Sequence, residues 1–177
     1  MNIKKLLWTS IFSITTTIAT ASPYGINVSY LILDKDPQYL YGYRFSLQYY
    51  PSSWVWKNVH IFIDGGYGHW WVDHADNYGS LNIYSIAPVL RLYFANQFLS
   101  PFFDISIGPS YMTNTRISNR NLGMHFAFQD QMGLGISFGQ QKNLSISVTS
   151  LHYSNGSLCA MNAGITIPLM LNVSYRF

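Results

Sequence analysis

Apolar side chains alternate with small or polar ones along nearly all of the chain after residue 21, and this alternation is the feature that most constrains the fold. Successive side chains of a β-strand point to opposite faces, so the pattern is typical of strands whose two faces meet different surroundings. No segment after residue 21 has the periodicity of a helix. We expect eight strands, over residues 25–33, 39–50, 58–73, 81–95, 100–113, 122–138, 143–155 and 163–177.

The length of these segments and the composition distinguish a membrane-embedded sheet from a soluble one. Most segments exceed the ~5–6 residues of a typical soluble strand and reach the ~9–11 residues that a tilted strand needs to cross a bilayer. Only 10% of the residues are charged, whereas a soluble domain averages about 25%. No apolar run after the N-terminal segment has the ~18 residues of a membrane helix. We therefore predict an all-β fold, an eight-stranded antiparallel transmembrane β-barrel, rather than a soluble sandwich.

The polar face of the predicted strands suits the interior of a small barrel. Eight strands leave an interior that side chains just fill, which argues against a diffusion pore. The chain ends in alternating aromatic residues, Tyr175 and Phe177, and this ending resembles the C-terminal assembly signal of bacterial outer-membrane barrels. We therefore expect the bacterial cell outer membrane as the location. The charged residues expected to face the interior are Arg44, Asp64, Arg91, Asp104 and Arg176.

The first 21 residues have the pattern of a secretory signal peptide. Lys4 and Lys5 supply the positive start, and a hydrophobic stretch follows over residues 6–18. Residues 19–21, Ala-Thr-Ala, form an A-x-A cleavage site. We predict a signal peptide over residues 1–21 and an outer-membrane barrel over residues 22–177.

Charge and cysteine content exclude several classes of function. The net charge of +3 is small and the basic residues are scattered, so no nucleic-acid partner is expected. The single cysteine, Cys159, excludes an internal disulfide. The aromatic run at residues 69–74 contains two histidines, but we interpret it as an interfacial girdle and expect no metal site. The acidic residues are seven aspartates and no glutamate, so a mechanism that needs a carboxylate must use an aspartate.

A serine and a histidine lie two residues apart on the face predicted to meet lipid. On the segment 143–155 the apolar residues have even numbers, and Ser150, His152 and Ser154 continue that face. Polar groups are costly there and call for a reason. A Ser–His pair near the outer interface can attack the ester of an outer-leaflet lipid, because the imidazole takes the hydroxyl proton. The spacing alone also fits two interfacial residues without chemistry.

Several motifs strengthen the catalytic interpretation. Residues 152–155, His-Tyr-Ser-Asn, are followed by residues 162–165, Asn-Ala-Gly-Ile, and together they resemble the signature of the lipid A 3-O-deacylase (PagL) family. Residues 121–123 and 128–133 resemble the region of the family's sixth strand. The resemblance covers most of the chain after residue 21. It implies an outer-membrane barrel that acts as a carboxylic ester hydrolase and cleaves the ester-linked 3-hydroxyacyl chain at position 3 of lipid A, without a cofactor.

The resemblance also implies roles for individual residues. Ser154 matches the family's nucleophile and His152 its general base. Asn155 matches an asparagine whose side chain helps to form the oxyanion hole, and the backbone N–H of Ser157 would supply the second donor. The family often has glycine at the position of Ser157, whereas here the glycine is Gly156, one residue earlier.

The family's catalytic acid is missing from this chain. The glutamate that orients the histidine follows the Asn-x-Gly-Ile run directly, and that position is Thr166 here. Asp130 is a candidate substitute, because a hairpin closed around residues 140–142 places it opposite His152. Asp130 also fits a role in strand packing or in a hydrogen bond to Ser150. As a further alternative, the Thr166 hydroxyl holds the imidazole; Thr166 has inward parity, so this requires a bulge at Pro168 that reverses it.

Two classes of function follow. The first is a lipid A 3-O-deacylase, with lipopolysaccharide and outer-membrane lipid as partners. The second is a non-catalytic small barrel for adhesion or membrane structure that has lost its catalytic acid. The oligomeric state is open, and a homodimer is compatible with the sequence.

Overall fold

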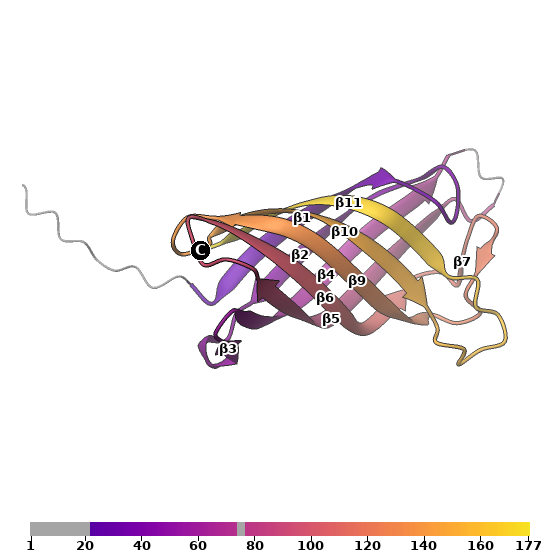
Figure 1. Ribbon diagram of the computed structural model, residues 1–177. Helices are drawn as coiled ribbons and strands as arrows, with labels where there is room; N and C mark the ends of the chain where they lie inside the picture. Colours follow the sequence, from indigo (N-terminus) through magenta and orange to yellow (C-terminus); the bar gives the residue numbers. More distant parts are fainter. Residues whose placement is uncertain (1–21, 74–76) are drawn as a thin grey trace, which may run out of the picture.

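The computed structural model describes residues 22–73 and 77–177, and the predicted signal peptide lies outside this part of the chain. Eight long antiparallel strands form one closed barrel (Figure 1). Neighbouring strands follow the order β2-β1-β11-β10-β9-β6-β5-β4, and pairing of β4 with β2 closes the ring. The prediction of an eight-stranded barrel is therefore confirmed. The strands are β1 Tyr24–Leu33, β2 Leu40–Tyr49, β4 Val59–Val72, β5 Ser80–Tyr93, β6 Leu99–Met112, β9 Phe126–Phe138, β10 Leu144–Ser154 and β11 Ile165–Arg176.

Short elements lie in two of the connections, where the sequence predicted none. The connection from β2 to β4 holds the 3-10 turn η1 (Ser52–Trp54) and β3 (Val55–Trp56), which pairs with the start of β4. The connection from β6 to β9 holds a small hairpin of β7 (Arg116–Ile117) and β8 (Arg120–Asn121). The predicted strand 122–138 therefore began too early, because the chain turns at Gly123 with a φ of 74° before β9 starts.

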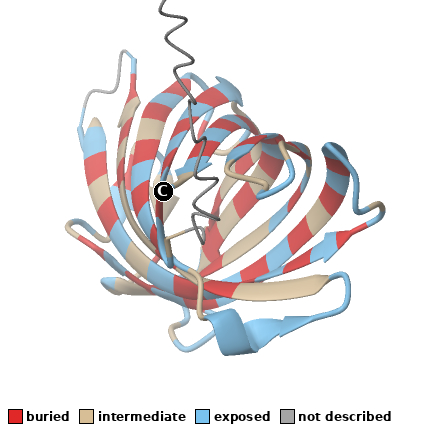
Figure 2. Cartoon of the chain, turned by 90° about the vertical axis from the view of Figure 1, so that its left-hand side faces the viewer, coloured by how far each residue is buried: buried red, intermediate tan, exposed pale blue. Residues whose placement is uncertain are grey.

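Burial alternates along each strand, as the bands along the barrel wall show (Figure 2). The apolar set faces outward and the polar set fills the interior. Arg44 pairs with Asp64, and Arg91 pairs with Asp104 at 2.8 Å, with all four side chains buried. The predicted polar interior is therefore confirmed. Among the described residues, no helix is long and apolar enough to cross a membrane.

Apolar side chains close the end of the barrel at which the β7–β8 hairpin lies (Figure 1). Ile117 and Leu122, both from the β6–β9 connection, are fully buried there. They belong to one cluster with Trp70, Leu151 and Tyr153, which point inward from β4 and β10. The longer connections, residues 113–125 and 155–164, lie at this end, which we therefore take as the extracellular one. The turn at residues 139–143 and the C-terminus lie at the other end.

The predicted parity of β11 holds in its C-terminal half and is wrong in its N-terminal half. Leu171, Val173 and Tyr175 are exposed as expected, but Ile165 and Ile167 are fully buried. The cause is a bulge: Thr149 pairs with Met170 and Leu151 pairs with Ile167, so two residues, 168 and 169, oppose Ser150 alone. The extra residue reverses which side chains face outward. Thr166 consequently lies on the same face as His152.

Candidate active site

Ser154 and His152 lie at the extracellular end of β10, on the outer wall of the barrel. Both are half-buried, whereas Leu151 and Tyr153, which alternate with them, are fully buried in the interior. The local pattern follows from the period of the strand, which sends every second side chain to the same face. The prediction that both residues share the outward face is confirmed.

The imidazole of His152 is held by Thr166. His152 and Thr166 are paired across β10 and β11, and Nδ1 of the ring lies 2.9 Å from Oγ1 of the threonine. This contact depends on the bulge at residues 168 and 169, because without it Thr166 would point into the interior. The arrangement proposed as an alternative from the sequence is therefore the one that the structure contains.

Asp130 lies opposite His152 across β9 and β10, which confirms the predicted hairpin register. The outward parity of β9 is also as predicted, since Met132, Leu134 and Ile136 are exposed and Ala127 and Gln129 are buried. However, within the described part of the chain the Asp130 carboxylate forms no hydrogen bond or ion pair, with His152 or with Ser150. Thr166, rather than Asp130, is therefore the residue within hydrogen-bonding distance of the imidazole Nδ1.

The ring of His152 rests directly on Gly164. A Cβ atom at position 164 would lie 2.7 Å from Cε1 of the imidazole and 2.8 Å from the carbonyl oxygen of Tyr153. Real Cβ atoms do not approach other atoms so closely, so any larger residue would displace the ring. Glycine at 164 is therefore required by the position of the imidazole.

Hydrogen bonds from two loops hold the segment that carries Gly164 and Thr166 in place. Asp36, from the β1–β2 loop, forms a backbone bridge with Thr166, with N–O distances of 2.9 and 3.3 Å. Arg120, from the β7–β8 hairpin, donates through Nε to the Gly164 carbonyl at 2.8 Å. Its Nη1 atom also lies 3.8 Å from the Asp36 carboxylate. The guanidinium thus ties both loops to the backbone beside the histidine.

The two groups expected to form the oxyanion hole are engaged in the loop itself. Asn155 is fully buried, and its Nδ2 donates to the carbonyls of Leu122 and Met161, both at 2.7 Å. The backbone N–H of Ser157 donates to Oδ1 of Asn155 at 2.9 Å. In this conformation Asn155 therefore organises the loop that follows Ser154, and its Nδ2 hydrogens are taken up by loop carbonyls.

Asn162 lies next to this loop and has a free donor. Its Oδ1 accepts a hydrogen bond from the backbone N–H of Asn155 at 2.9 Å, which fixes the side chain one residue from Ser154. Among residues 22–73 and 77–177, Nδ2 of Asn162 has no hydrogen-bond partner, and the same is true of the backbone N–H of Gly156. Both residues are exposed, and Gly156 follows Ser154 by two residues.

Sequence reasoning missed the roles of three residues in this site. Asn162 and Gly164 stand within the family-like motif, so the signal was present, but the spacing alone assigns them no contact. Arg120 comes from a hairpin far away in the sequence, and no local pattern connects it with Gly164. In the described part of the chain no group of three side chains is arranged to hold a metal ion.

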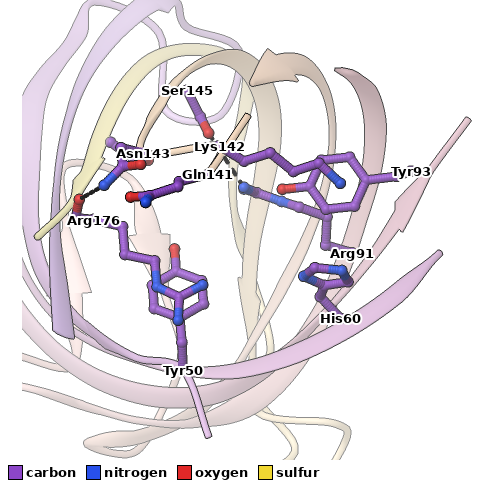
Figure 3. Close-up of a pocket in the computed structure, with 10 residues that line it drawn as sticks. Tyr50, His60, Arg91, Tyr93, Gln141, Lys142, Asn143, Ser145 and Arg176 are labelled. Atoms are coloured by element: carbon purple, nitrogen blue, oxygen red, sulfur yellow. Dashed lines mark hydrogen bonds between the residues drawn. The ribbon is translucent and has the colours of Figure 1, made fainter. Parts of the chain in front are cut away.

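A small cavity lies inside the barrel, at the end opposite Ser154 and His152 (Figure 3). Its volume of about 30 Å³ leaves room for roughly one water molecule. Lys142, in the turn between β9 and β10, lies 3.7 Å from the centre of the Tyr93 ring. Burial lowers the pKa of Lys142, and the charge of Arg91 adds to this effect. The lining residues are Tyr50, His60, Arg91, Tyr93, Gln141, Lys142, Asn143, Ser145, Ser174 and Arg176.

Together, the fold and the site define a class: a small transmembrane β-barrel with a serine and a histidine side by side on its outer wall. Comparison with known proteins narrows this class. The lipid A 3-O-deacylase (PagL) family matches residues 38–176, and the chain belongs to that family.

Individual relatives agree with this assignment. The chain is 30% identical to the lipid A deacylase PagL of Pseudomonas aeruginosa over 92% of its own length and 93% of the relative. It is 23% identical to the lipid A deacylase PagL of Bordetella bronchiseptica over 72% and 71% of the two chains. The crystal structure of the outer membrane enzyme PagL superposes with a TM-score of 0.73 at 26% identity, covering 86% of this chain and 99% of that one. The chain is thus an outer-membrane barrel, as its sequence predicted.

Proposed function

We propose that this protein is a lipid A 3-O-deacylase that hydrolyses the ester-linked 3-hydroxyacyl chain at position 3 of lipid A in the outer leaflet. The observation that carries the proposal is the position of His152 and Ser154 on the lipid-facing wall of a barrel of this family. A hydrolase in this place meets its ester at the membrane interface, so the lipid need not leave the bilayer.

In the first step Ser154 acts as the nucleophile and His152 as the general base. We assign the imidazole tautomer in which Nδ1–H donates to Thr166 Oγ1, because this leaves Nε2 free to accept a proton. Nε2 takes the proton of the Ser154 hydroxyl while Oγ attacks the ester carbonyl carbon. The tetrahedral intermediate then collapses, and the protonated imidazole returns the proton to the departing sugar oxygen. The acyl chain remains bound to Ser154.

The second step releases the fatty acid. His152 removes a proton from a water molecule, which attacks the acyl carbon, and the proton then returns to Ser154 Oγ. The negative oxygen that forms in both steps needs preorganised donors. The family resemblance implies this role for Asn155 and the Ser157 N–H, whose hydrogens bond within the loop here. Asn162 Nδ2 and the Gly156 N–H, by contrast, have no hydrogen-bond partner among the described residues. We therefore propose Asn162 and Gly156 as the donors, with Asn155 shaping the loop.

Thr166 takes the orienting role of the missing glutamate. A hydroxyl accepts the Nδ1–H bond and so preserves the tautomer, but it brings no negative charge to stabilise the imidazolium. Asp130 is the alternative orienting group, and it stays a prediction because its carboxylate forms no hydrogen bond or ion pair with the ring in the described part of the chain. We infer an enzyme that works through a Ser–His pair fixed by a neutral third residue.

Delivery to the outer membrane requires export, and we propose that residues 1–21 are the signal peptide that is removed. The intact mass of the protein recovered from outer membranes tests this. A chain that begins at Ser22 supports the proposal, and retention of the first 21 residues contradicts it.

Mass spectrometry of lipid A from cells that express the protein tests the activity. We expect the loss of one 3-hydroxyacyl chain in cells with the wild-type protein and unchanged lipid A in cells with Ser154→Ala. Unchanged lipid A in both, with the barrel folded in the outer membrane, would support the non-catalytic alternative instead.

A further inference from the structure

A row of paired residues crosses the outer wall of the barrel from Ser154 toward the middle of the membrane. Ser154 pairs with Phe128 of β9, and Phe128 pairs with Pro109 of β6. On the next strand the pairing of Ser85 with Ser110 places Ile86 beside Pro109. The row therefore joins the candidate nucleophile with three neighbouring strands.

This row descends as it leaves the active site. Ser154 is the last residue of β10, at its extracellular end, whereas Ile86 lies well inside β5, which begins at Ser80. Barrel strands tilt by ~35–45°, so a row that runs perpendicular to them is inclined to the membrane plane. An acyl chain whose ester lies at Ser154 must likewise run obliquely from the interface into the hydrocarbon region.

An open groove of about 380 Å³ lies between the Ile86–Pro109 end of this row and the neighbouring row Tyr84–Tyr111–Phe126, which is two residues nearer the extracellular strand ends. Tyr84, Ile86 and Tyr111 project outward around it with exposed fractions of 51%, 56% and 55%. Phe126 forms the wall nearest the active site, and its ring contacts Phe128 edge-to-face at 5.0 Å between centroids. The distance from β10 to β6 is about 10 Å, two interstrand spacings of ~4.8 Å. The groove thus begins within reach of a chain attached at Ser154.

Two prolines lie where the ladder between the strands at the groove is interrupted, and one of them, Pro109, lines the groove. The β5–β6 ladder is interrupted between the pair Ser85–Ser110 and the pair Val89–Ser106, although the register is unchanged. Pro88 and Pro109 lie inside this gap, and a proline has no N–H to contribute to a ladder. The groove therefore lies where β5 and β6 keep their register but lack part of their pairing.

We propose that this groove binds the 3-O-acyl chain of lipid A and determines which chain lengths are cleaved. The inference rests on the proposed deacylase function and names the substrate contact that the catalytic residues leave undefined. The outward side chains of the groove are aromatic or aliphatic, as contact with a saturated chain requires. Its continuity with the Ser154–Phe128 pair argues for the substrate's own chain as the occupant, rather than a neighbouring lipid.

The test compares two synthetic glucosamine-based lipid A precursors that differ only in the length of the 3-O-acyl chain, presented to the purified protein in identical detergent micelles. Ile86→Trp fills the groove, and we expect the ratio of kcat/KM for the long chain over the short chain to fall about tenfold. Ile86→Ala deepens the groove and is expected to shift the ratio toward the long chain. Retained cleavage of the short chain shows that a variant is folded.

Val173→Trp is the matched control. Val173 is 45% exposed on the outer face of β11 and pairs with Ile146, in the half of the β10–β11 hairpin remote from Ser154, so the same added bulk meets lipid away from the row. We expect the wild-type ratio for this variant. A wild-type ratio in both Ile86 variants, or an equal shift in Val173→Trp, would overturn the inference. If the wild-type protein cleaves neither precursor, the proposed function itself fails, and the subsite fails with it.

Discussion

Thr166 Oγ1 lies 2.9 Å from Nδ1 of His152, at the position where the family resemblance places a glutamate. The contact exists because a bulge at residues 168 and 169 turns the first part of β11 over, so that the threonine faces outward. A neutral hydroxyl in this place orients the imidazole without adding charge.

Changing Thr166 should separate orientation from charge. We expect Thr166→Val to lower kcat about tenfold, because the lost hydrogen bond contributes about 1–1.5 kcal/mol. Thr166→Ser keeps the hydroxyl and should retain most of the activity. Thr166→Glu should raise kcat about tenfold, because a charge-assisted bond to the imidazolium is stronger than a neutral one. Single-turnover rates on a defined lipid A substrate measure the effect of all three variants. Equal rates for Thr166→Val and Thr166→Ser would contradict the role of the hydroxyl.

Asp130 provides the complementary measurement. Its carboxylate forms no hydrogen bond or ion pair with the imidazole in the described structure, so Asp130→Asn should change the deacylation rate by less than about twofold. A much larger loss in a folded barrel would show that Asp130 reaches His152 during the reaction. The double variant with Thr166→Val then distinguishes the two groups, because non-additive losses indicate that both act on the same ring.

Gly164 should be sensitive to the smallest enlargement. In Gly164→Ala the new methyl group would overlap the imidazole edge of His152, and we expect kcat to fall about a hundredfold from the displaced ring. Gly65→Ala is the matched control, because a Cβ there would have only the Leu47 carbonyl oxygen nearby, at 4.0 Å. Both variants should retain the heat-modifiable electrophoretic mobility of a folded barrel. Equal activity of the two would contradict the close packing of the ring on Gly164.

Arg120 should act on catalysis from outside the reacting groups. Arg120→Ala removes the bond to the Gly164 carbonyl, and we expect kcat to fall about tenfold with little change in KM, because the segment behind His152 loosens. Asp36→Ala should lower kcat less than Arg120→Ala does, because the Asp36 carboxylate lies 3.8 Å from the guanidinium in a partly exposed ion pair. A change confined to KM would instead indicate that Arg120 contacts the substrate.

The parts of the site predicted from the sequence are those that follow from the period of a strand. The outward parity of His152 and Ser154, and the pairing of Asp130 with His152, needed only the alternation and the length of one hairpin turn. The alternation alone did not predict that Thr166 faces outward. A bulge reverses which side chains face outward, and no residue pattern marks a bulge uniquely. Pro168 allowed the bulge but did not require it.

The alternation of apolar and polar residues did not predict the contacts that the loops make. The fully buried Leu122 was assigned to a strand, whereas it lies in the connection that closes the barrel end. Arg120 and Asp36 reach the site through tertiary packing of two separate loops. The side-chain amide of Asn155 was expected to help form the oxyanion hole, but it donates to the carbonyls of Leu122 and Met161. These two partners are distant in sequence from Asn155 or lie in the following loop, so the strand pattern did not predict them.

The most direct test of the central claim is the release of free 3-hydroxy fatty acid from defined lipid A by the purified barrel, measured beside Ser154→Ala and His152→Ala. The account predicts release by the wild-type protein, loss of release in both variants and a folded barrel in all three. Equal release by the wild-type protein and Ser154→Ala, or none from a folded wild-type barrel, would contradict it.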